Sequence, residues 1–329
     1  MRIAVDAMGG DYAPQEIVAG ALEAAQAYPD LEIILVGQPE ALNPFIQTLP
    51  ENISIHPASE VVEMDEHPAT AVRRKKDSSI VVATRLVKEG HAAAVVSAGS
   101  TGAQMAAALF GLGRIKGIER PAIATVLPTA QGGKLVLDVG ANPDAKPKQL
   151  YQYGLMGSIY ANRILHLDRP KVALLNIGAE ETKGNELALA SYELLKHAPV
   201  NFIGNIEGRD IPKGTADVVV CDGFVGNIVL KFAEGLASSL FGMIKEQITA
   251  SPSRKLGALL VKPGLKEIAK VMDYAEYGGS PLLGVDGVSI VCHGSSKAKA
   301  IRNAIRVARE CVESKYLEEI KTHLKEEKE

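Results

Sequence analysis

Polar and charged residues stand directly after short apolar runs at several places along the chain, and glycine accompanies almost all of them. Glycine lets the backbone amides of a loop approach an anion closely, and a helix that begins after such a loop points its free N–H groups at the same place. The pattern therefore predicts a site for phosphate or another oxyanion. The candidate ligand-binding residues are Asp6, Ser100, Thr101, Asp138, Asn142, Asp222, Gly226, Asn227, Lys231, Ser295 and Ser296.

Some of these residues have an equally good structural explanation. Asp, Ser and Asn are common helix caps, so Asp11, Ser100 and Asn142 could act as caps alone, and a tight turn needs the same glycines. Lys183 and Lys231 are different, because lysine is not a helix N-cap. A cation in such a loop can hold an oxyanion or stabilise negative charge that develops on a carbonyl oxygen.

Common nucleotide-binding and nucleophile motifs are missing from the chain. The loop GAEETKGN (178–185) lacks the spacing and the Lys-Ser/Thr pair of a Walker loop, and GLGRIKG (111–117) lacks the GxGxxG spacing. Cys292 and His293 are adjacent in a strand pattern and so point to opposite faces, which argues against a thiol nucleophile. Cys221 is expected to be a small core residue. No metal-ligand spacing occurs, so we expect neither a metal nor another cofactor.

The apolar runs alternate with helical patterns along the whole chain. RIAVDAMGGD precedes PQEIVAGALEAAQAY, and VSIVCHGSS precedes KAKAIRNAIRVARECVES. Alternation of this kind predicts βαβ units, a largely parallel sheet and a three-layer α/β/α fold. Ligands of such sheets bind at the carboxyl ends of the strands, where we expect all the candidate loops to lie. Residues 235–277 hold two helical patterns and no strand, which predicts a helical protrusion within a single domain over residues 1–329.

Composition limits the classes of partner. The 329 residues include 36 basic and 39 acidic side chains, so the net charge of −3 does not favour nucleic acid as a partner. The chain begins with a strand pattern, without a signal sequence, and three cysteines form no complete disulfide set. A cytoplasmic protein that does not span a membrane is expected. Contacts with anionic partners would have to come from local basic stretches.

A set of longer motifs carries a resemblance over essentially the whole chain. These motifs are VDAMGGDYAP (5–14), MDEHPATAVRRKKDSS (64–79), SAGSTGA (97–103), LDVGAN (137–142), LLNIGAEETKGN (174–185), FIGNIEGRDI (202–211), CDGFVGNIVLK (221–231), and GGSPLLGVDG with HGSS (278–296). The sequence closely resembles the bacterial phosphate acyltransferase family. The resemblance implies that inorganic phosphate attacks the thioester of a long-chain acyl carrier protein and gives an acyl phosphate for phospholipid synthesis. It also implies a homodimer with a fold like isopropylmalate dehydrogenase and phosphotransacetylase.

That reaction needs a positioned phosphate, a stabilised oxyanion and help for the leaving thiolate. We expect the amides of the GSTG and GFVGN loops to bind phosphate together with Asn227 and Ser295 or Ser296. Lys183 and Asn185 would stabilise the oxyanion of the tetrahedral intermediate. His293 would move the proton.

Two basic stretches could contact the partners that the resemblance implies. The run Arg73, Arg74, Lys75 and Lys76 could dock an acidic acyl carrier protein, although a solvated helix face is the commoner use of such a run. The segment 254–270 mixes lysines with leucines and could lie on the inner face of the membrane, near a membrane glycerol-3-phosphate acyltransferase. Packing against a second subunit is the alternative there. The apolar residues expected at the membrane are Leu256, Leu259, Leu260 and Val261.

Three other functions remain open at this stage. A phosphotransacetylase that uses short acyl-CoA would share the fold and the phosphate nucleophile. A non-catalytic scaffold for acyl carrier protein would have no need of so many polar loops. A decarboxylating dehydrogenase would require metal-binding carboxylates and a nucleotide pocket, and neither pattern is found in the sequence.

Overall fold

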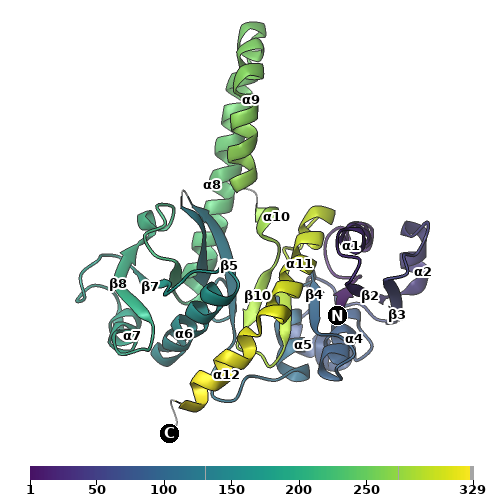
Figure 1. Ribbon diagram of the computed structural model, residues 1–329, viewed down its shortest axis with the longest axis horizontal. Coiled ribbons are helices and arrows are strands. Elements are labelled where there is room, and N and C mark those ends of the chain that lie inside the picture. The colour runs from purple at the N-terminus through teal and green to yellow at the C-terminus, as the bar shows by residue number, and fades with distance from the viewer. Residues whose placement is uncertain (130, 273, 327–329) are drawn as a thin grey trace.

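In the computed structural model, which describes residues 1–326 apart from 130 and 273, eleven strands form one continuous sheet (Figure 1). Its order is β3-β2-β1-β4-β11-β10-β5-β6-β9-β7-β8. The strands are β1 (Arg2–Asp6), β2 (Glu32–Gly37), β3 (Ile53–Pro57), β4 (Ala94–Ser97), β5 (Ala122–Thr129), β6 (Gly132–Leu137), β7 (Lys171–Asn176), β8 (Asn201–Glu207), β9 (Val218–Val220), β10 (Ser280–Leu283) and β11 (Val288–Val291).

Helices cover the sheet and extend from it. They are α1 (Gln15–Ala27), α2 (Pro39–Leu42), α3 (Pro68–Arg74), α4 (Ser79–Lys88), α5 (Thr101–Gly111), α6 (Pro147–Arg163), α7 (Glu186–Lys196), α8 (Gly223–Thr249), α9 (Pro252–Met272), α10 (Tyr274–Tyr277), α11 (Ala298–Ser314) and α12 (Tyr316–Glu326), with short 3-10 turns at Asn43–Phe45 and Gly208–Asp210.

Alternate residues of each strand serve the two outer layers. On β1, Ile3 and Val5 join the core that includes Ile17 of α1 and Ile301 of α11. Ala4, between them, joins the core on the other face, which includes residues of α4 and α5. Because both faces of the sheet are covered, inner strands such as β4 and β9 are continuously buried rather than alternating. The predicted three-layer α/β/α fold is confirmed.

The sheet is largely parallel, but three successive antiparallel pairs separate two parallel groups. The strands β3, β2, β1, β4 and β11 run parallel to one another, and so do β6, β9, β7 and β8. Between the two groups, the pairs β11/β10, β10/β5 and β5/β6 are all antiparallel. Three reversals invert the second group. We call β3, β2, β1, β4 and β11 with their helices the first half of the protein, and β6, β9, β7 and β8 with theirs the second half. The candidate loops follow the carboxyl ends of strands as expected, but those ends point in opposite directions in the two halves.

The expected helical protrusion is present and begins earlier than predicted. Helices α8 and α9 form a hairpin that extends far from the sheet (Figure 1). The first helix starts at Gly223, before the expected boundary at residue 235, because its first turns still pack on the sheet. Organisation of residues 1–329 as one catalytic domain stays a prediction.

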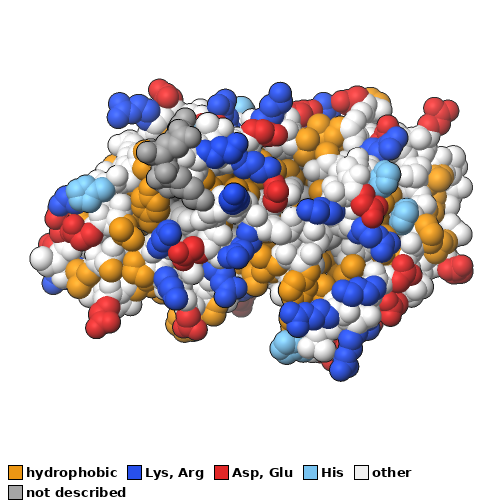
Figure 2. Space-filling view, turned by 90° about the horizontal axis from the view of Figure 1, so that it is seen from below, with side chains coloured by type: hydrophobic (Ala, Val, Ile, Leu, Met, Phe, Trp, Pro, Cys, Tyr) orange, Lys and Arg blue, Asp and Glu red, His pale blue; other side chains and the backbone are white. Residues whose placement is uncertain are grey.

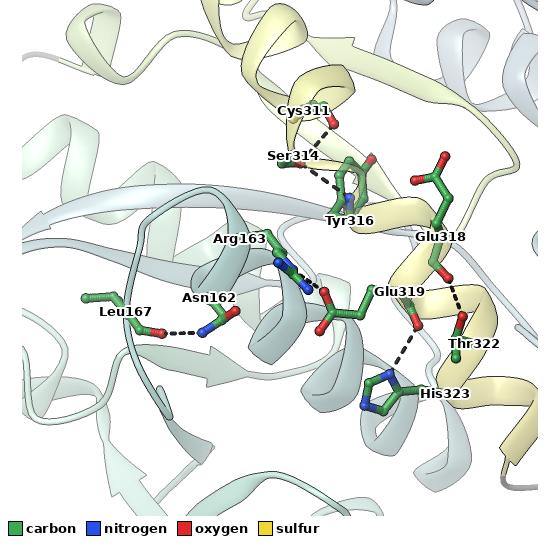
Figure 3. Close-up of polar contacts among 10 residues, drawn as sticks. All are labelled: Asn162, Arg163, Leu167, Cys311, Ser314, Tyr316, Glu318, Glu319, Thr322 and His323. Atoms are coloured by element: carbon green, nitrogen blue, oxygen red, sulfur yellow. Dashed lines mark hydrogen bonds and ion pairs between the residues drawn. The ribbon is translucent and has the colours of Figure 1, made fainter.

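Helix α12 ties the two halves together. Figure 3 shows Arg163 of α6 reaching Glu319 of α12, with which it forms an ion pair. Tyr316, at the start of α12, is fully buried and packs edge-on against Tyr160 with ring centroids 5.8 Å apart. Since α12 continues from α11 of the first half, this contact joins that half to α6 of the second.

Candidate active site

Three loops of the first half meet through their backbones at the carboxyl ends of β1, β4 and β11. The amide of Asp11 donates to the carbonyl of Gly294 over 2.8 Å, and the amide of Cys292 donates to Ser97 over the same distance. Gly10 has a φ of +119°, and a β-carbon there would lie 3.1 Å from the Ala98 carbonyl oxygen. Only glycine fits this position easily. The first half thus presents closely packed loops with little side-chain bulk.

Asp6 lies behind these loops. Its side chain is 2% exposed and accepts a hydrogen bond of 2.7 Å from the Ser97 hydroxyl, which in turn accepts from the Gly99 amide at 3.0 Å. Burial raises the pKa of the Asp6 carboxyl, and hydrogen bonds from Ser79 and Ser97 oppose that shift. The structure therefore gives Asp6 a role in shaping the Gly99 loop; a direct contact with substrate, as the sequence suggested, would need that loop to open.

Ser100 and Thr101 lie at the N-terminus of α5. Ser100 occupies the N-cap position of α5, but its side chain makes no capping hydrogen bond. Its hydroxyl is therefore not used to cap the helix. A cavity of about 10 Å³, room for about one water molecule, lies beside it against Asp6 and Ser97. The free N–H groups of the first turn make this helix end suitable for an anion.

Asp138 and Asn142 order a tight turn in the second half. The Asp138 carboxylate is fully buried and accepts from the amides of Ile123, Ala141 and Asn142 at 2.7–3.1 Å. Burial raises its pKa, while these hydrogen bonds lower it. The Asn142 side chain donates to the Pro121 carbonyl at 2.6 Å. These contacts give both residues a structural role and leave Asp138 out of reach of solvent.

The first turns of α8 rest on that turn. Asp222 is the N-cap and accepts from the amides of Phe224 and Val225 at 3.0 and 2.9 Å. Gly226 is buried against the Asp138 backbone. Asn227, one position further, is exposed, and a β-carbon at Gly140 would lie 3.7 Å from its Oδ1. Of the candidates in this turn, Asn227 is therefore the one placed to contact a ligand.

Lys183 and Asn185 lie in the loop between β7 and α7. Asn185 caps α7 by accepting from the Ala188 amide at 2.9 Å, which leaves its Nδ2 group available as a donor. Asn176 fixes the loop by donating to the Lys183 carbonyl at 2.9 Å, and the Lys183 side chain is exposed. This loop adjoins the start of α8, because β7 and β9 are neighbours in the sheet.

Lys231 and His293 bring the two halves together. Lys231 lies two turns into α8, and its Nζ is 2.9 Å from Nε2 of His293 in the loop after β11. The His293 Nδ1 is 2.7 Å from Ser295 Oγ, whereas Ser296 is buried beneath the same turn. The strands of the two halves point in opposite directions, but helix α8 carries a cation, Lys231, from the second half to the polar loops of the first.

An apolar surface that the sequence analysis missed begins at this contact. Phe224, Ile228 and Lys231 recur at i, i+4 and i+7 on α8 and share one face, and both apolar side chains are more than half exposed. The exposed apolar surface continues along α8 through Phe232, Leu236, Leu240 and Met243. By length and hydropathy, α8 is the one helix of the described residues that could cross a membrane. Only 6% of its most apolar stretch is buried against the rest of the protein, so this stretch is almost entirely exposed. The apolar periodicity of residues 224–243 was the signal available in the sequence.

The basic run 73–76 is divided in its contacts. Lys75 is turned inward: it pairs with Glu66 at 2.6 Å and donates to the Val61 carbonyl at 2.7 Å. The Arg73 guanidinium lies 4.8 Å above the Phe110 ring centre, and Arg74 and Lys76 are exposed. Figure 2 shows Lys and Arg side chains with Asp and Glu between them across the lower face, which therefore carries mixed charge.

In the first half of α9, the described side chains expected at the membrane are exposed. Leu260 is 86% exposed, Leu256 69% and Val261 53%. The side chain of Leu259 lies outside the described residues.

The three cysteines are buried within the described fold. Burial raises the pKa of the Cys292 thiol to about 12, and it also raises the pKa of the Cys221 thiol well above its ordinary value. A thiolate nucleophile is therefore disfavoured at neutral pH.

Among the described residues, no group of three His, Cys, Asp or Glu side chains has the arrangement of a metal site.

A larger cavity lies elsewhere, between α6 and α11. It measures about 500 Å³ and is lined by residues that include Arg163 and Arg306. Each of these cations is paired with a glutamate, Glu319 and Glu310 respectively. Because its charges already have partners, we do not place the oxyanion site in this cavity.

Known proteins resemble this chain over nearly its whole length. Residues 1–319 match the family described as fatty acid synthesis protein. The phosphate acyltransferase of Desulfitobacterium hafniense is 72% identical over 98% of both chains, and that of Heliobacterium modesticaldum is 62% identical over the same shares. The chain belongs to this family of phosphate acyltransferases. The expected enzyme class, acyltransferase, is confirmed.

Solved structures support the predicted fold of this phosphate acyltransferase family member. A phosphotransacetylase from Streptococcus pyogenes superposes with a TM-score of 0.63 at 18% identity, covering 95% of this chain and 94% of the other. A 4-hydroxythreonine-4-phosphate dehydrogenase from Klebsiella pneumoniae gives a TM-score of 0.51 at 14% identity over 95% and 99%. At these identities the comparison establishes the fold alone. The substrates have to be inferred from the site.

Proposed function

We propose that the protein transfers a long-chain acyl group from acyl carrier protein to inorganic phosphate and releases an acyl phosphate for phospholipid synthesis. The observation that carries the proposal is the apolar face of α8, which begins beside Lys231. A phosphate held by the polar loops would attack a thioester whose acyl chain lies along that face. From Ile228 to Leu240 the face extends for about 18 Å of helix.

Phosphate binds, in this proposal, between the N-terminus of α5 and the start of α8. The first-turn amides of α5, with Ser100 and Thr101, supply donors on one side, and Asn227, Lys231 and Ser295 supply them on the other. Cations and N–H groups of this kind are the usual ligands of phosphate. Asp6, Asp138, Asn142, Asp222 and Gly226 contribute by holding the loops, and Ser296 supports the turn that carries Ser295.

A phosphate oxygen then attacks the thioester carbonyl carbon, and the C–S bond breaks as the tetrahedral intermediate collapses. Lys183 and the Asn185 amide group stabilise the oxyanion of this intermediate. The hydroxyl proton of the phosphate passes by way of the Ser295 hydroxyl to the leaving thiolate, and His293, which the sequence suggested as the group that moves the proton, holds Ser295 in place. Phosphate is itself the nucleophile, so the chemistry needs no covalent enzyme intermediate, metal or cofactor.

The partners follow from the same chemistry. An acidic acyl carrier protein would dock near Arg73, Arg74 and Lys76, whereas Lys75 is engaged with Glu66. Leu256, Leu259, Leu260 and Val261 would enter the inner face of the cell membrane, where a membrane acyltransferase for glycerol 3-phosphate could take up the apolar product. The protein would thus be cytoplasmic and peripherally bound, and part of the apolar surface of α8 and α9 would pair in a homodimer.

The rival function is a phosphotransacetylase that acts on short acyl-CoA. The exposed apolar face of α8 favours the long-chain proposal, because a two-carbon acyl group has no use for it. Purified protein should be incubated with phosphate and either palmitoyl carrier protein or acetyl-CoA, and free thiol and acyl phosphate measured. Release from palmitoyl carrier protein is expected. Release from acetyl-CoA alone would establish the rival function, and no release from either would favour a scaffold.

A further inference from the structure

We infer that Glu234 is a positioning residue that decides, through Lys231 and His293, whether Ser295 presents a hydrogen-bond donor to phosphate. The inference rests on the proposed function of this site. Glu234 lies one turn after Lys231 on α8, and its Oε2 is 2.9 Å from Lys231 Nζ. That ammonium is also 2.9 Å from His293 Nε2, and His293 Nδ1 is 2.7 Å from Ser295 Oγ. Four side chains therefore form one chain of contacts from α8 to the loop after β11.

The chain of contacts selects one tautomer of His293. A lysine ammonium has donors only, so Nε2 must accept from Lys231 and the neutral ring carries its proton on Nδ1. Nδ1 then donates to Ser295 Oγ. The Ser295 amide also lies 3.2 Å from Nδ1 and would favour the opposite tautomer, but that tautomer places the Nε2 proton directly against the ammonium. We therefore assign the proton to Nδ1 while Lys231 stays in place.

The tautomer sets what Ser295 offers to an anion. When Ser295 Oγ accepts from Nδ1, its own hydroxyl proton is left to donate to a phosphate oxygen. In the opposite tautomer the hydroxyl donates to Nδ1 and presents lone pairs, which repel phosphate. Glu234 holds the arrangement because it keeps the flexible Lys231 side chain at His293. It acts through Lys231 and need not touch substrate.

Glu234→Gln tests this role, because the amide keeps the size of the side chain and removes the charge that holds the ammonium. We expect the KM for phosphate to rise about tenfold, the effect of losing one hydrogen bond to a charged group, while the KM for acyl carrier protein stays unchanged. Adding Glu234→Gln to Lys231→Met should have no further effect. Glu310→Gln, which breaks a similar ion pair with Arg306 on α11, serves as the control and should leave both constants unchanged.

A measurement that does not depend on turnover accompanies the kinetics. Nitrogen NMR of the His293 ring, identified by the signal lost in His293→Asn, should report a proton on Nδ1 in the unsubstituted protein and a shift toward Nε2 in Glu234→Gln. The same tautomer in both proteins, or equal increases in both KM values, would overturn the inference. If the protein formed no acyl phosphate at all, the proposed function would fail, and the NMR result would still decide the tautomer.

Discussion

The backbone of Gly226 passes so close to Asp138 that a β-carbon on Gly226 would lie 1.9 Å from the Asp138 carbonyl oxygen. This contact joins the first turn of α8 to the turn after β6 and so fixes where α8 starts. Because α8 carries both Asn227 and Lys231, the geometry of the candidate site depends on position 226, where only glycine fits.

Gly226→Ala is expected to destabilise the protein by about 3 kcal/mol, since the backbone must move to admit the methyl group. Activity should fall as well, because α8 shifts relative to His293. Denaturant unfolding measures the first effect. Gly235→Ala on the same helix is the control: nothing lies within 4 Å of the added carbon, so stability should rise by about 0.5–1 kcal/mol. Equal effects of the two substitutions would contradict the close contact.

Lys183→Ala should lower acyl phosphate formation by roughly a hundredfold or more, which is the usual cost of losing one oxyanion donor. Its exposed side chain predicts almost no change in thermal stability. Lys213→Ala, which removes another exposed lysine of the second half, should leave the rate unchanged. If a folded Lys183→Ala protein kept the original rate, the oxyanion assignment would be abandoned.

Phe232→Ser should impair turnover of long acyl chains by about 10- to 100-fold, the value of burying one large apolar side chain. Short acyl substrates should be affected little. The side chain is 68% exposed on α8, so folding should be preserved. Rates with four-carbon and sixteen-carbon carrier substrates provide the comparison, and Leu49→Ser, at an exposed site of the first half, provides the control. A uniform loss for all chain lengths, together with dissociation into monomers, would assign Phe232 to a subunit interface instead.

Leu260→Glu should weaken binding to anionic vesicles by about tenfold, because a charge replaces an exposed apolar side chain of α9. Activity on soluble substrates should be retained. Vesicle flotation measures the binding, with Leu194→Glu on α7 as the control. Unchanged flotation would favour packing of this part of α9 against another subunit.

Asp217 should make stability depend on pH in the acid range. Burial raises the pKa of this carboxyl, but hydrogen bonds from Lys134 at 2.7 Å and from the Lys171 amide at 2.8 Å outweigh burial, and the net shift is downward. A lowered pKa stabilises the folded state above the unfolded value of about 3.9, and the contribution disappears as pH falls through the folded value.

Asp217→Asn is accordingly expected to cost about 2 kcal/mol near pH 7 and progressively less below about pH 4. Urea unfolding at several pH values measures the difference. Asp30→Asn, whose carboxylate is largely exposed beside Arg309, should cost almost nothing at any pH. A cost for Asp217→Asn that did not vary with pH would show that the charge of the carboxylate is unimportant.

Much of the fold could be predicted because local patterns determine it. Apolar runs followed by small residues and helical periods specify β1 with α1 and β11 with α11. The reversal of the sheet could not be predicted, because it includes the antiparallel pairing of β10 with β5, two strands far apart in the sequence. The contact of Lys231 with His293 depends on that reversal, so it could not be predicted from the sequence either.

Residue types predicted the site better than they predicted individual roles. Ser295 and His293 lie together as the short HGSS motif suggests. Asp6 and Asp138 were expected to bind ligand, but both are buried beneath their loops. Sequence spacing alone does not distinguish a carboxylate that faces a ligand from one that accepts backbone amides. The apolar face of α8 was overlooked because its residues also fit an ordinary core helix.

The position of β11 in the sheet has a consequence for the order in which the protein matures. This strand lies between β4 and β10, although β4 is synthesised long before it. A growing chain leaves the ribosome with β4 as an open edge that can pair with other chains. The four residues Val288–Val291 close that edge and deliver His293 to Lys231. Protection against aggregation and catalytic competence therefore arise in the same late step of synthesis.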